Sequence, residues 1–185
     1  LGVERKLVND LPAKPSLIVA NHLSWLDVLV LGSFIPVRFL SKDEIRSWPI
    51  IGRLAHGAQT LFIKRGDRSS AEKAITEIEE VLRSDEFVVV FPEGTSTHGP
   101  MPSRFKGRLI EAARRAGVAV CPVAIYYSGP GKEFAPYAGD DELGLHMKRL
   151  VAAPPICAYV SVGDLISSDQ MTIPIAKEAQ SRVED

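Results

Sequence analysis

The chain has 185 residues and a net charge of −1, and its composition is 45% hydrophobic and 24% charged. That balance is typical of one folded domain, and it excludes both a disordered tail and the global positive field of nucleic-acid-binding proteins. The two cysteines, Cys121 and Cys157, lie in apolar stretches without CxxC spacing, so we expect neither a zinc site nor a redox motif. Buried reduced thiols favour a cytosolic location over a secreted one.

Short apolar strands alternate with amphipathic segments along the chain, which is typical of an α/β domain. In chain order the pattern predicts a strand over 16–20, a helix ending at Leu31, strands over 37–41 and 59–64, a helix over 69–83, a strand over 87–91, a helix over 104–116, a strand over 118–125, a short helix near 142–151 and a strand over 157–162. We therefore predict an α/β fold with a mostly parallel mixed sheet flanked by helices. We expect a single domain over 1–185, with a motif-bearing core at about 16–127 and C-terminal loops, a strand and a helix at 128–185.

Polar clusters follow directly on three of the predicted strands. They are Asn21-His22, Lys64-Arg65 and Glu93-Gly94-Thr95. In α/β sheets the loops at the carboxyl ends of parallel strands form the ligand crevice. If these strands run parallel, the three clusters meet at one edge of the sheet and form a site there.

The first cluster pairs a histidine with a carboxylate five residues later, His22 and Asp27. An imidazole is the natural general base near neutral pH, and a carboxylate on its other nitrogen fixes the tautomer and stabilises the imidazolium. The sequence has no GxSxG elbow and no cysteine near a histidine, so the pair would activate a hydroxyl of the substrate. On spacing alone, a capping aspartate beside a polar histidine explains the pattern equally well.

The other two clusters suit polar or anionic groups of a substrate. The turn after residues 87–91 offers the Glu93 carboxylate, backbone N–H groups and the Thr95 hydroxyl at one point. Lys64 and Arg65 can hold a phosphate, the arginine through a bidentate fork. A solvated turn and a charged surface strand end are the alternatives for these two clusters taken singly.

Together the clusters resemble the four ordered sequence blocks of the glycerolipid acyltransferases, whose best-known members are the 1-acylglycerol-3-phosphate acyltransferases. The blocks here are NHLSWLD (21–27), WPIIGRLAHGAQTLFIKRG (48–66), FPEGTS (91–96) and VCPVAI (120–125). The likeness runs from about Ser16 to Tyr127. NHxxxxD followed by FPEGT is a specific pair, and an α/β core of the glycerolipid acyltransferase type is the fold that the resemblance implies.

The resemblance also implies a role for each matching residue. His22 would deprotonate the acceptor hydroxyl, and Asp27 would orient His22, so that the hydroxyl attacks the thioester without an acyl-enzyme. The implied acceptor-binding residues are Asn21, Lys64, Arg65, Glu93, Gly94, Thr95 and Ser96, and Pro122 would shape the acyl-donor side. The donor would be acyl-carrier protein or coenzyme A thioester, and no metal or other cofactor is implied.

Family members work at a membrane surface, so we expect a membrane-associated protein at the cytoplasmic face of the inner (plasma) membrane. The most apolar run, 28–35, is far shorter than the roughly 20 residues that a spanning helix needs. The chain begins at Leu1 rather than Met, so we expect either that a membrane segment precedes this sequence or that the protein is peripheral. A basic stretch over 104–115 could meet anionic lipid, and a solvated surface is the alternative.

One departure from the family pattern concerns the acceptor. Ser96 stands where the commonest form of the third block has an arginine, a cation that would serve a phosphate. We expect 1-acyl-sn-glycerol-3-phosphate as the acceptor, giving phosphatidic acid. Ser96 keeps open an aminolipid acceptor such as lyso-ornithine lipid, because branches that acylate these lipids also carry small polar residues there. A non-catalytic lipid-binding domain and a thioesterase are further alternatives.

Overall fold

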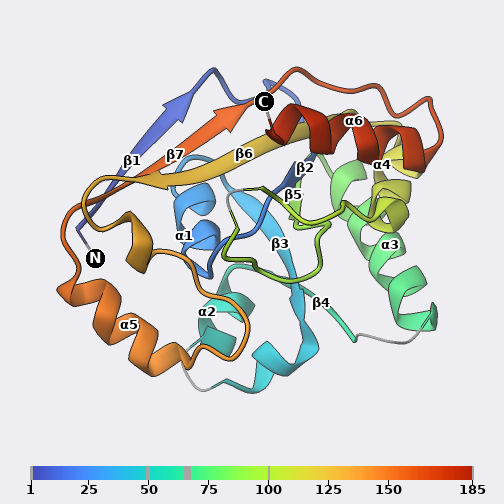
Figure 1. Cartoon of the computed structure of the whole chain (residues 1–185). Coiled ribbons are helices and arrows are strands. Elements are labelled where there is room, and N and C mark those ends of the chain that lie inside the picture. Colours follow the sequence, from blue (N-terminus) through green and yellow to red (C-terminus); the bar gives the residue numbers. More distant parts are fainter. Residues whose placement is uncertain (1, 49–50, 65–67, 100, 185) are drawn as a thin grey trace.

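Seven strands form one sheet in the order β1-β7-β6-β2-β5-β3-β4. The computed structural model describes residues 2–48, 51–64, 68–99 and 101–184 (Figure 1). The strands are β1 (Val3–Val8), β2 (Leu17–Ala20), β3 (Val37–Lys42), β4 (Leu61–Ile63), β5 (Phe87–Val90), β6 (Val120–Ser128) and β7 (Ile156–Val162). The helices are α1 (Leu26–Gly32), α2 (Ile51–Gly57), α3 (Arg68–Arg83), α4 (Glu111–Ala116), α5 (Leu143–Ala152) and α6 (Thr172–Glu184), with 3-10 turns η1 (Asp43–Ser47), η2 (Gly107–Ile110) and η3 (Lys132–Phe134).

The predicted mostly parallel mixed sheet is confirmed. Strands β2, β5, β3 and β4 run parallel to one another, β6 runs parallel to β2, and β1 runs parallel to β7. In the described part of the chain, β6 and β7 form the one antiparallel pair. The inner strands read as unbroken apolar runs, LIVA in β2 and FVVV in β5, because helices cover both of their faces.

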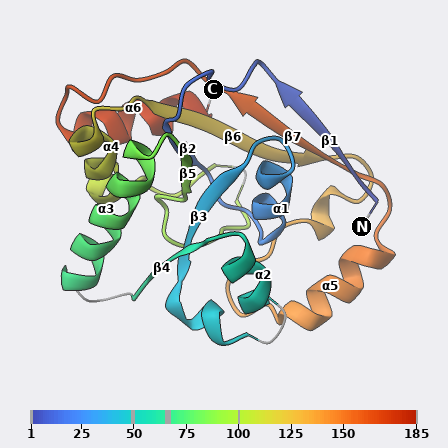
Figure 2. The same ribbon diagram turned by 180° about the vertical axis from the view of Figure 1, so that it is seen from behind.

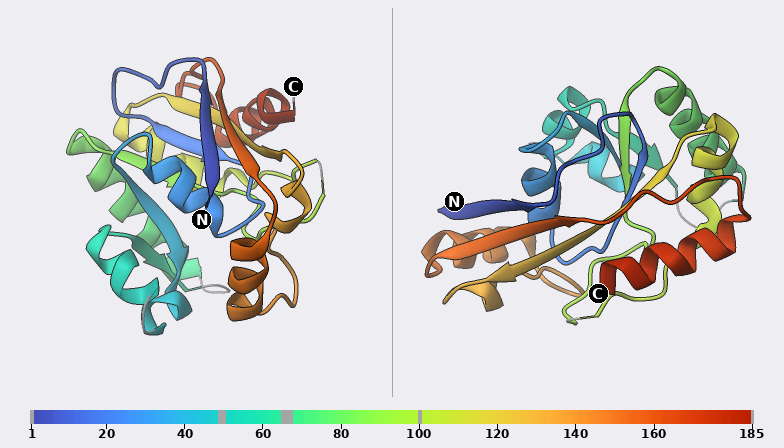
Figure 3. Two further views of the ribbon diagram at one scale, coloured as in Figure 1. Left: turned by 90° about the vertical axis from the view of Figure 1, so that its left-hand side faces the viewer. Right: turned by 90° about the horizontal axis from the view of Figure 1, so that it is seen from above.

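The two faces of the sheet carry separate hydrophobic clusters. Alternate side chains of β2 divide between them: Leu17 and Val19 join the cluster with α3, α4 and α6, whereas Ile18 and Ala20 join the cluster with α1 and α5. Figures 1 and 2 show α3, α4 and α6 grouped at one end of the molecule, with α5 at the other. The chain is therefore a three-layer α/β domain, and Figure 3 shows the twisted sheet between its helices from two further sides.

The predicted helix over 104–116 is wrong at its start. Residues 104–106 are not helical, and the segment becomes η2 and then α4. The backbone N–H of Phe105 donates to Gln180 Oε1 at 2.9 Å, and that of Lys106 donates to Pro92 O at 3.1 Å. Acceptors from distant parts of the chain thus bind the N–H groups of these two residues, which would have no partner within the first turn of a helix. Gly117 ends α4 in the left-handed region at φ 69°, as its position predicts.

Strand β1 and helices α2 and α6 have no counterpart among the predicted elements. Strand β1 is almost wholly exposed, and its sequence VERKLV shows no alternation of apolar and polar residues. It forms because its backbone pairs with β7 at the edge of the sheet. Helix α2 has seven residues and lies within the second sequence block.

Candidate active site

The carboxyl ends of β2 and β5 meet at one edge of the sheet, as the parallel order predicts. His22 follows β2 and Glu93 follows β5, and the His22 N–H donates to Glu93 Oε1 at 2.7 Å. The Thr97 N–H in turn donates to His22 O at 2.9 Å. Two hydrogen bonds therefore join the NHxxxxD loop to the FPEGT loop, although they lie about 70 residues apart in the sequence.

His22 and Asp27 are in direct contact. Nδ1 of His22 lies 2.8 Å from Oδ2 of Asp27, and the same oxygen accepts the N–H groups of Leu23 at 2.7 Å and Ser24 at 2.9 Å. The Asp27 side chain is fully buried, whereas that of His22 is 20% exposed. A carboxylate can only accept at Oδ2, so Nδ1 carries a proton, and in the neutral ring the lone pair is then on Nε2. This is the tautomer of a general base.

The His22 ring is fixed on its flat side as well. It stacks on Phe91 with ring centroids 4.0 Å apart and an angle of 18° between the planes. Asp27 also lies in the first turn of α1, so it organises the loop that precedes the helix. Asp27 does not cap α1, whose N-cap residue Trp25 has no side-chain cap; its carboxylate instead accepts N–H groups of the preceding loop and contacts His22.

Glu93 is buried behind His22 rather than open to solvent. Its residue is 3% exposed, Oε1 accepts the His22 N–H, and Oε2 accepts the Ser103 N–H at 2.6 Å. Burial raises the pKa of Glu93 above its ordinary value, while the two N–H donors lower it. The net effect is a raised pKa, with each carboxyl oxygen still accepting one backbone N–H. In this structure Glu93 positions the His22 backbone.

The turn after Glu93 requires glycine. Gly94 has φ 79°, in the left-handed region, and a Cβ placed on it would lie 3.1 Å from Lys106 Nζ. That ammonium donates to Glu93 O at 3.0 Å, which places a cation over the turn. Thr95 is exposed and Ser96 is partly exposed at the same turn, where both can meet a ligand.

Asn21 and Pro122 act within the sheet. The Asn21 amide is buried, donates to Ile125 O at 2.8 Å and accepts from Ile125 N at 2.7 Å, which extends the β2–β6 ladder through a side chain. Pro122 is buried opposite Val19, and its carbonyl accepts the Gly163 N–H at 2.9 Å. The assignment of Pro122 to the donor side remains a prediction.

The structure describes only one of the two cations that were predicted to bind a phosphate, Lys64 and Arg65. Lys64 is exposed just after β4, while Arg65 lies outside the described residues. Strands β5 and β3 separate β4 from β2, so at the usual spacing the end of β4 is about 14 Å from that of β2 along the sheet. Lys64 therefore shares an edge of the sheet with the His22–Asp27 pair but is not in contact with it, and its part in binding a substrate stays a prediction.

A family model described as Acyltransferase matches residues 3–126. The chain belongs to this acyltransferase family. It is accordingly an enzyme that transfers acyl groups. The residues matched contain the His22–Asp27 pair, Glu93 and most of β6.

Relatives of this acyltransferase include proteins named for lyso-ornithine lipid and proteins named for 1-acyl-sn-glycerol-3-phosphate. The "Lyso-ornithine lipid O-acyltransferase" of Pseudomonas aeruginosa is 40% identical over 187 residues, which cover 99% of this chain and 72% of the relative. The "1-acyl-sn-glycerol-3-phosphate acyltransferase" of Neisseria meningitidis is 34% identical over 158 residues, covering 83% of this chain and 62% of that protein. Among solved structures, the 1-acyl-sn-glycerophosphate (LPA) acyltransferase PlsC of Thermotoga maritima matches with a TM-score of 0.70 at 19% identity, covering 98% of this chain and 69% of that one. The last likeness concerns the fold.

Three polar residues of the acyltransferase site carry no signal in the sequence blocks. Tyr127 donates to Asp27 from β6, Ser103 donates to Glu93, and Lys106 binds the carbonyl of Glu93. A fourth contact holds the NHxxxxD loop from α5: Trp25 Nε1 donates to Nδ1 of the buried His146 at 3.0 Å. Tyr127 and His146 lie 100 and 121 positions from their partners, and Ser103 and Lys106 lie 10 and 13 positions from Glu93, outside the four sequence blocks.

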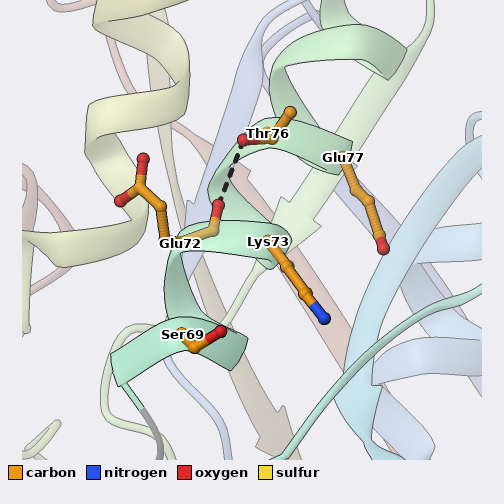
Figure 4. A pocket seen from close by; sticks show the side chains of 5 residues that line it. All are labelled: Ser69, Glu72, Lys73, Thr76 and Glu77. Carbon is orange, nitrogen blue, oxygen red and sulfur yellow. Dashed lines mark hydrogen bonds between the residues drawn. The ribbon is translucent and has the colours of Figure 1, made fainter.

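A hollow of about 480 Å³ lies away from this site, beside α3. It is lined by Ser69, Glu72, Lys73, Thr76 and Glu77 (Figure 4). All five belong to the exposed side of one helix, where Thr76 Oγ1 donates to Glu72 O at 3.2 Å. The His22–Asp27 pair is not part of this hollow, and none of the predicted site residues lines it.

In the part of the chain that the structure describes, no three or more His, Cys, Asp or Glu side chains are grouped to share a metal ion. No helix in the described ranges is both long and apolar enough to span a bilayer. The basic stretch over 104–115 is partly neutralised, since Arg114 pairs with Glu111 and Arg115 with Glu72.

Proposed function

We propose that this acyltransferase moves a fatty acyl group from a thioester to the free hydroxyl of a lysolipid, with His22 as general base and Asp27 as the residue that orients it. The observation that carries the proposal is the 2.8 Å contact between His22 Nδ1 and Asp27 Oδ2. It leaves Nε2 as an acceptor on a partly exposed ring, at the edge of the sheet where ligands bind in α/β folds. The names of the relatives support a lysolipid as acceptor.

The chemistry follows from that tautomer. The acceptor hydroxyl gives its proton to His22 Nε2 as its oxygen attacks the thioester carbonyl carbon. The tetrahedral intermediate collapses with cleavage of the C–S bond, and the leaving sulfur takes the proton from the imidazolium. The products are an ester and a free thiol, and His22 regains its starting state. Asp27 stabilises the positive charge that His22 carries between the two proton transfers.

For the acceptor we favour lyso-ornithine lipid over 1-acyl-sn-glycerol-3-phosphate. The relative named for lyso-ornithine lipid matches 99% of the chain at 40% identity, more than the relatives named for the glycerol phosphate. Ser96 lacks the cation that a phosphate would use, which points the same way. Lys106 is exposed, and its ammonium, which donates to Glu93 O at 3.0 Å, can also contact an anionic group of the head group.

For the donor we propose an acyl-carrier protein or coenzyme A thioester, and for the location the cytoplasmic face of the inner membrane. A lysolipid with a long acyl chain resides in a membrane, so the reaction takes place at its surface. The free, buried Cys121 and Cys157 suit a reducing compartment. No additional cofactor enters the proposed reaction.

The test is a transfer assay with mixed micelles of lysolipid and an acyl thioester, following both free thiol and acylated lipid. His22→Ala should lower kcat/KM by about 10²–10⁴-fold, the usual contribution of a positioned general base. His56→Ala, which removes an exposed histidine of α2, is the matched control and should keep wild-type activity. Equal activity in His22→Ala and wild type would refute the mechanism.

A panel of lysolipids separates the candidate acceptors and the rival functions. Preference for lyso-ornithine lipid supports the first acceptor, and preference for lysophosphatidate supports the second. Thiol release that does not depend on any acceptor would identify a thioesterase. Lipid binding without turnover would identify a non-catalytic domain.

A further inference from the structure

Asp27 is held by a residue of β6, the strand next to β2 in the sheet. The phenol of Tyr127, in β6, donates to Asp27 Oδ1 at 2.5 Å, and the two residues are 100 positions apart. The other carboxylate oxygen, Oδ2, already accepts from His22 Nδ1 and from two N–H groups of its own loop. Tyr127 therefore supplies the hydrogen-bond donor for Oδ1, the oxygen to which the loop donates no hydrogen bond.

We infer that Tyr127 is a positioning residue for acyl transfer, which acts on His22 through the carboxylate of Asp27. This inference rests on the function proposed above. Since the Asp27 side chain is fully buried, water cannot replace the phenol without opening the site. A carboxylate held at both oxygens cannot rotate, so the Oδ2 that orients His22 stays in place.

The position of Tyr127 is itself fixed by the site. The Asn21 side chain makes two hydrogen bonds with the backbone of Ile125, two residues before Tyr127 on the same strand. Asn21 is the residue before His22, so the same loop that carries the base also sets the register of β6. Alternation along β6 then puts Ile125 and Tyr127 on the face that carries α1 and Asp27.

Tyr127 stays a hydrogen-bond donor across the working pH range. Burial raises its pKa well above the ordinary value, and the negative charge of Asp27 raises it further. A neutral phenol is a dipole whose positive end faces the carboxylate. It offsets part of the negative charge that His22 experiences, and removing it should strengthen the hold of Asp27 on the proton of His22.

Other titratable groups around the pair come from different elements. Glu93, in the loop after β5, accepts from the His22 backbone, and the Lys106 ammonium binds the Glu93 carbonyl. His146 of α5 meets Trp25 in the same loop. None of these contacts involves the phenol of Tyr127, so a change confined to that hydroxyl leaves them in place.

The test is Tyr127→Phe, which removes one oxygen and keeps the ring. We expect kcat to fall about tenfold, the loss of one hydrogen bond to a charged group, with KM for donor and acceptor changed by less than about twofold. The acid limb of the kcat/KM profile should move to higher pH by roughly 0.5–1 unit, because Asp27 then attracts the imidazolium proton more strongly. Tyr126→Phe is the matched control: its ring is 47% exposed and stacks on Tyr159, and it should behave as wild type.

A double-mutant cycle distinguishes action through Asp27 from general loosening. In an Asp27→Asn background, Tyr127→Phe should have little further effect on kcat. Either of two results would overturn the inference. One is the same tenfold loss of kcat in both backgrounds. The other is a Tyr127→Phe variant whose kcat and acid limb both match those of wild type.

A readout without turnover separates this inference from the proposed function. In ¹H–¹⁵N spectra of the histidine rings, the His22 Nδ1–H resonance should shift in Tyr127→Phe and stay in place in Tyr126→Phe. If wild type transfers no acyl group but the resonance shifts, the proposed function fails while the coupling of Tyr127 to His22 stands. An unshifted resonance refutes the coupling whatever the enzyme's activity.

Discussion

Replacing Asp27 by asparagine or by alanine should separate its charge from its hydrogen bonds. Asp27 receives four donors: His22 Nδ1, Leu23 N and Ser24 N at Oδ2, and Tyr127 Oη at Oδ1. In Asp27→Asn the amide oxygen can take the three donors at Oδ2. The amide nitrogen then faces Tyr127, whose oxygen can accept from it. The network survives with its charge removed.

Stability should therefore differ between the two variants. Asp27→Asn should cost about 1–2 kcal/mol, as three hydrogen bonds lose their charge-assisted strength and the fourth reverses, with the amide nitrogen donating to Tyr127 Oη. Asp27→Ala leaves all four donors without an acceptor in a fully buried position, and it should cost about 3–5 kcal/mol. For a chain of this size, that difference is a gap of roughly 6 °C or more in Tm.

Activity should fall in both variants. His22 keeps its tautomer in Asp27→Asn, but the imidazolium that forms during transfer loses its counter-charge, so we expect a loss of about 10²–10⁴-fold in kcat. Urea unfolding followed by tryptophan fluorescence, beside the transfer assay, measures both quantities on the same samples. Wild-type turnover in Asp27→Asn, or equal stability of the two variants, would refute the reasoning.

Two further predictions concern the FPEGT loop. Glu93→Gln should lower kcat and leave the acceptor KM within about twofold. The reason is that one of two buried backbone N–H groups loses its acceptor, so His22 is less firmly held. A rise in acceptor KM alone would instead make Glu93 an acceptor-binding residue. Gly94→Ala should cost about 1 kcal/mol or more, measured as a fall in Tm, because φ is 79° and the new Cβ would meet Lys106 Nζ. Gly57→Ala, where a Cβ meets nothing within 4 Å, is its control, and an equal effect of the two changes would contradict this explanation.

Local patterns located the parts of the site that depend on short stretches of chain. The five-residue spacing of His22 and Asp27 sets their contact within one loop and one helical turn. The placement of Glu93 followed from a rule about parallel strands, whose carboxyl ends share an edge. Both predictions needed only the apolar runs of β2 and β5, which are unambiguous because helices bury both faces of these strands.

Roles were harder to assign than positions. The sequence suggested that Asn21 and Glu93 bind the acceptor, and the structure shows their polar atoms bonded to Ile125, His22 and Ser103. A side chain's partner depends on burial, and burial of a polar residue cannot be deduced from its neighbours in the sequence. The start of the predicted helix at 104 failed for a related reason, since Gln180 and Pro92 capture its backbone donors.

The sequence by itself therefore determined the fold class, the family blocks and the His22–Asp27 pair, because periodicity, turn residues and short spacings are local properties. Only the tertiary structure decided which oxygen of Asp27 faces His22 and which faces Tyr127. It also showed that Lys106, and not a residue of the FPEGT block, brings a cation to the turn. Those contacts depend on how strands and loops far apart in the chain pack against each other, and no local pattern encodes that register.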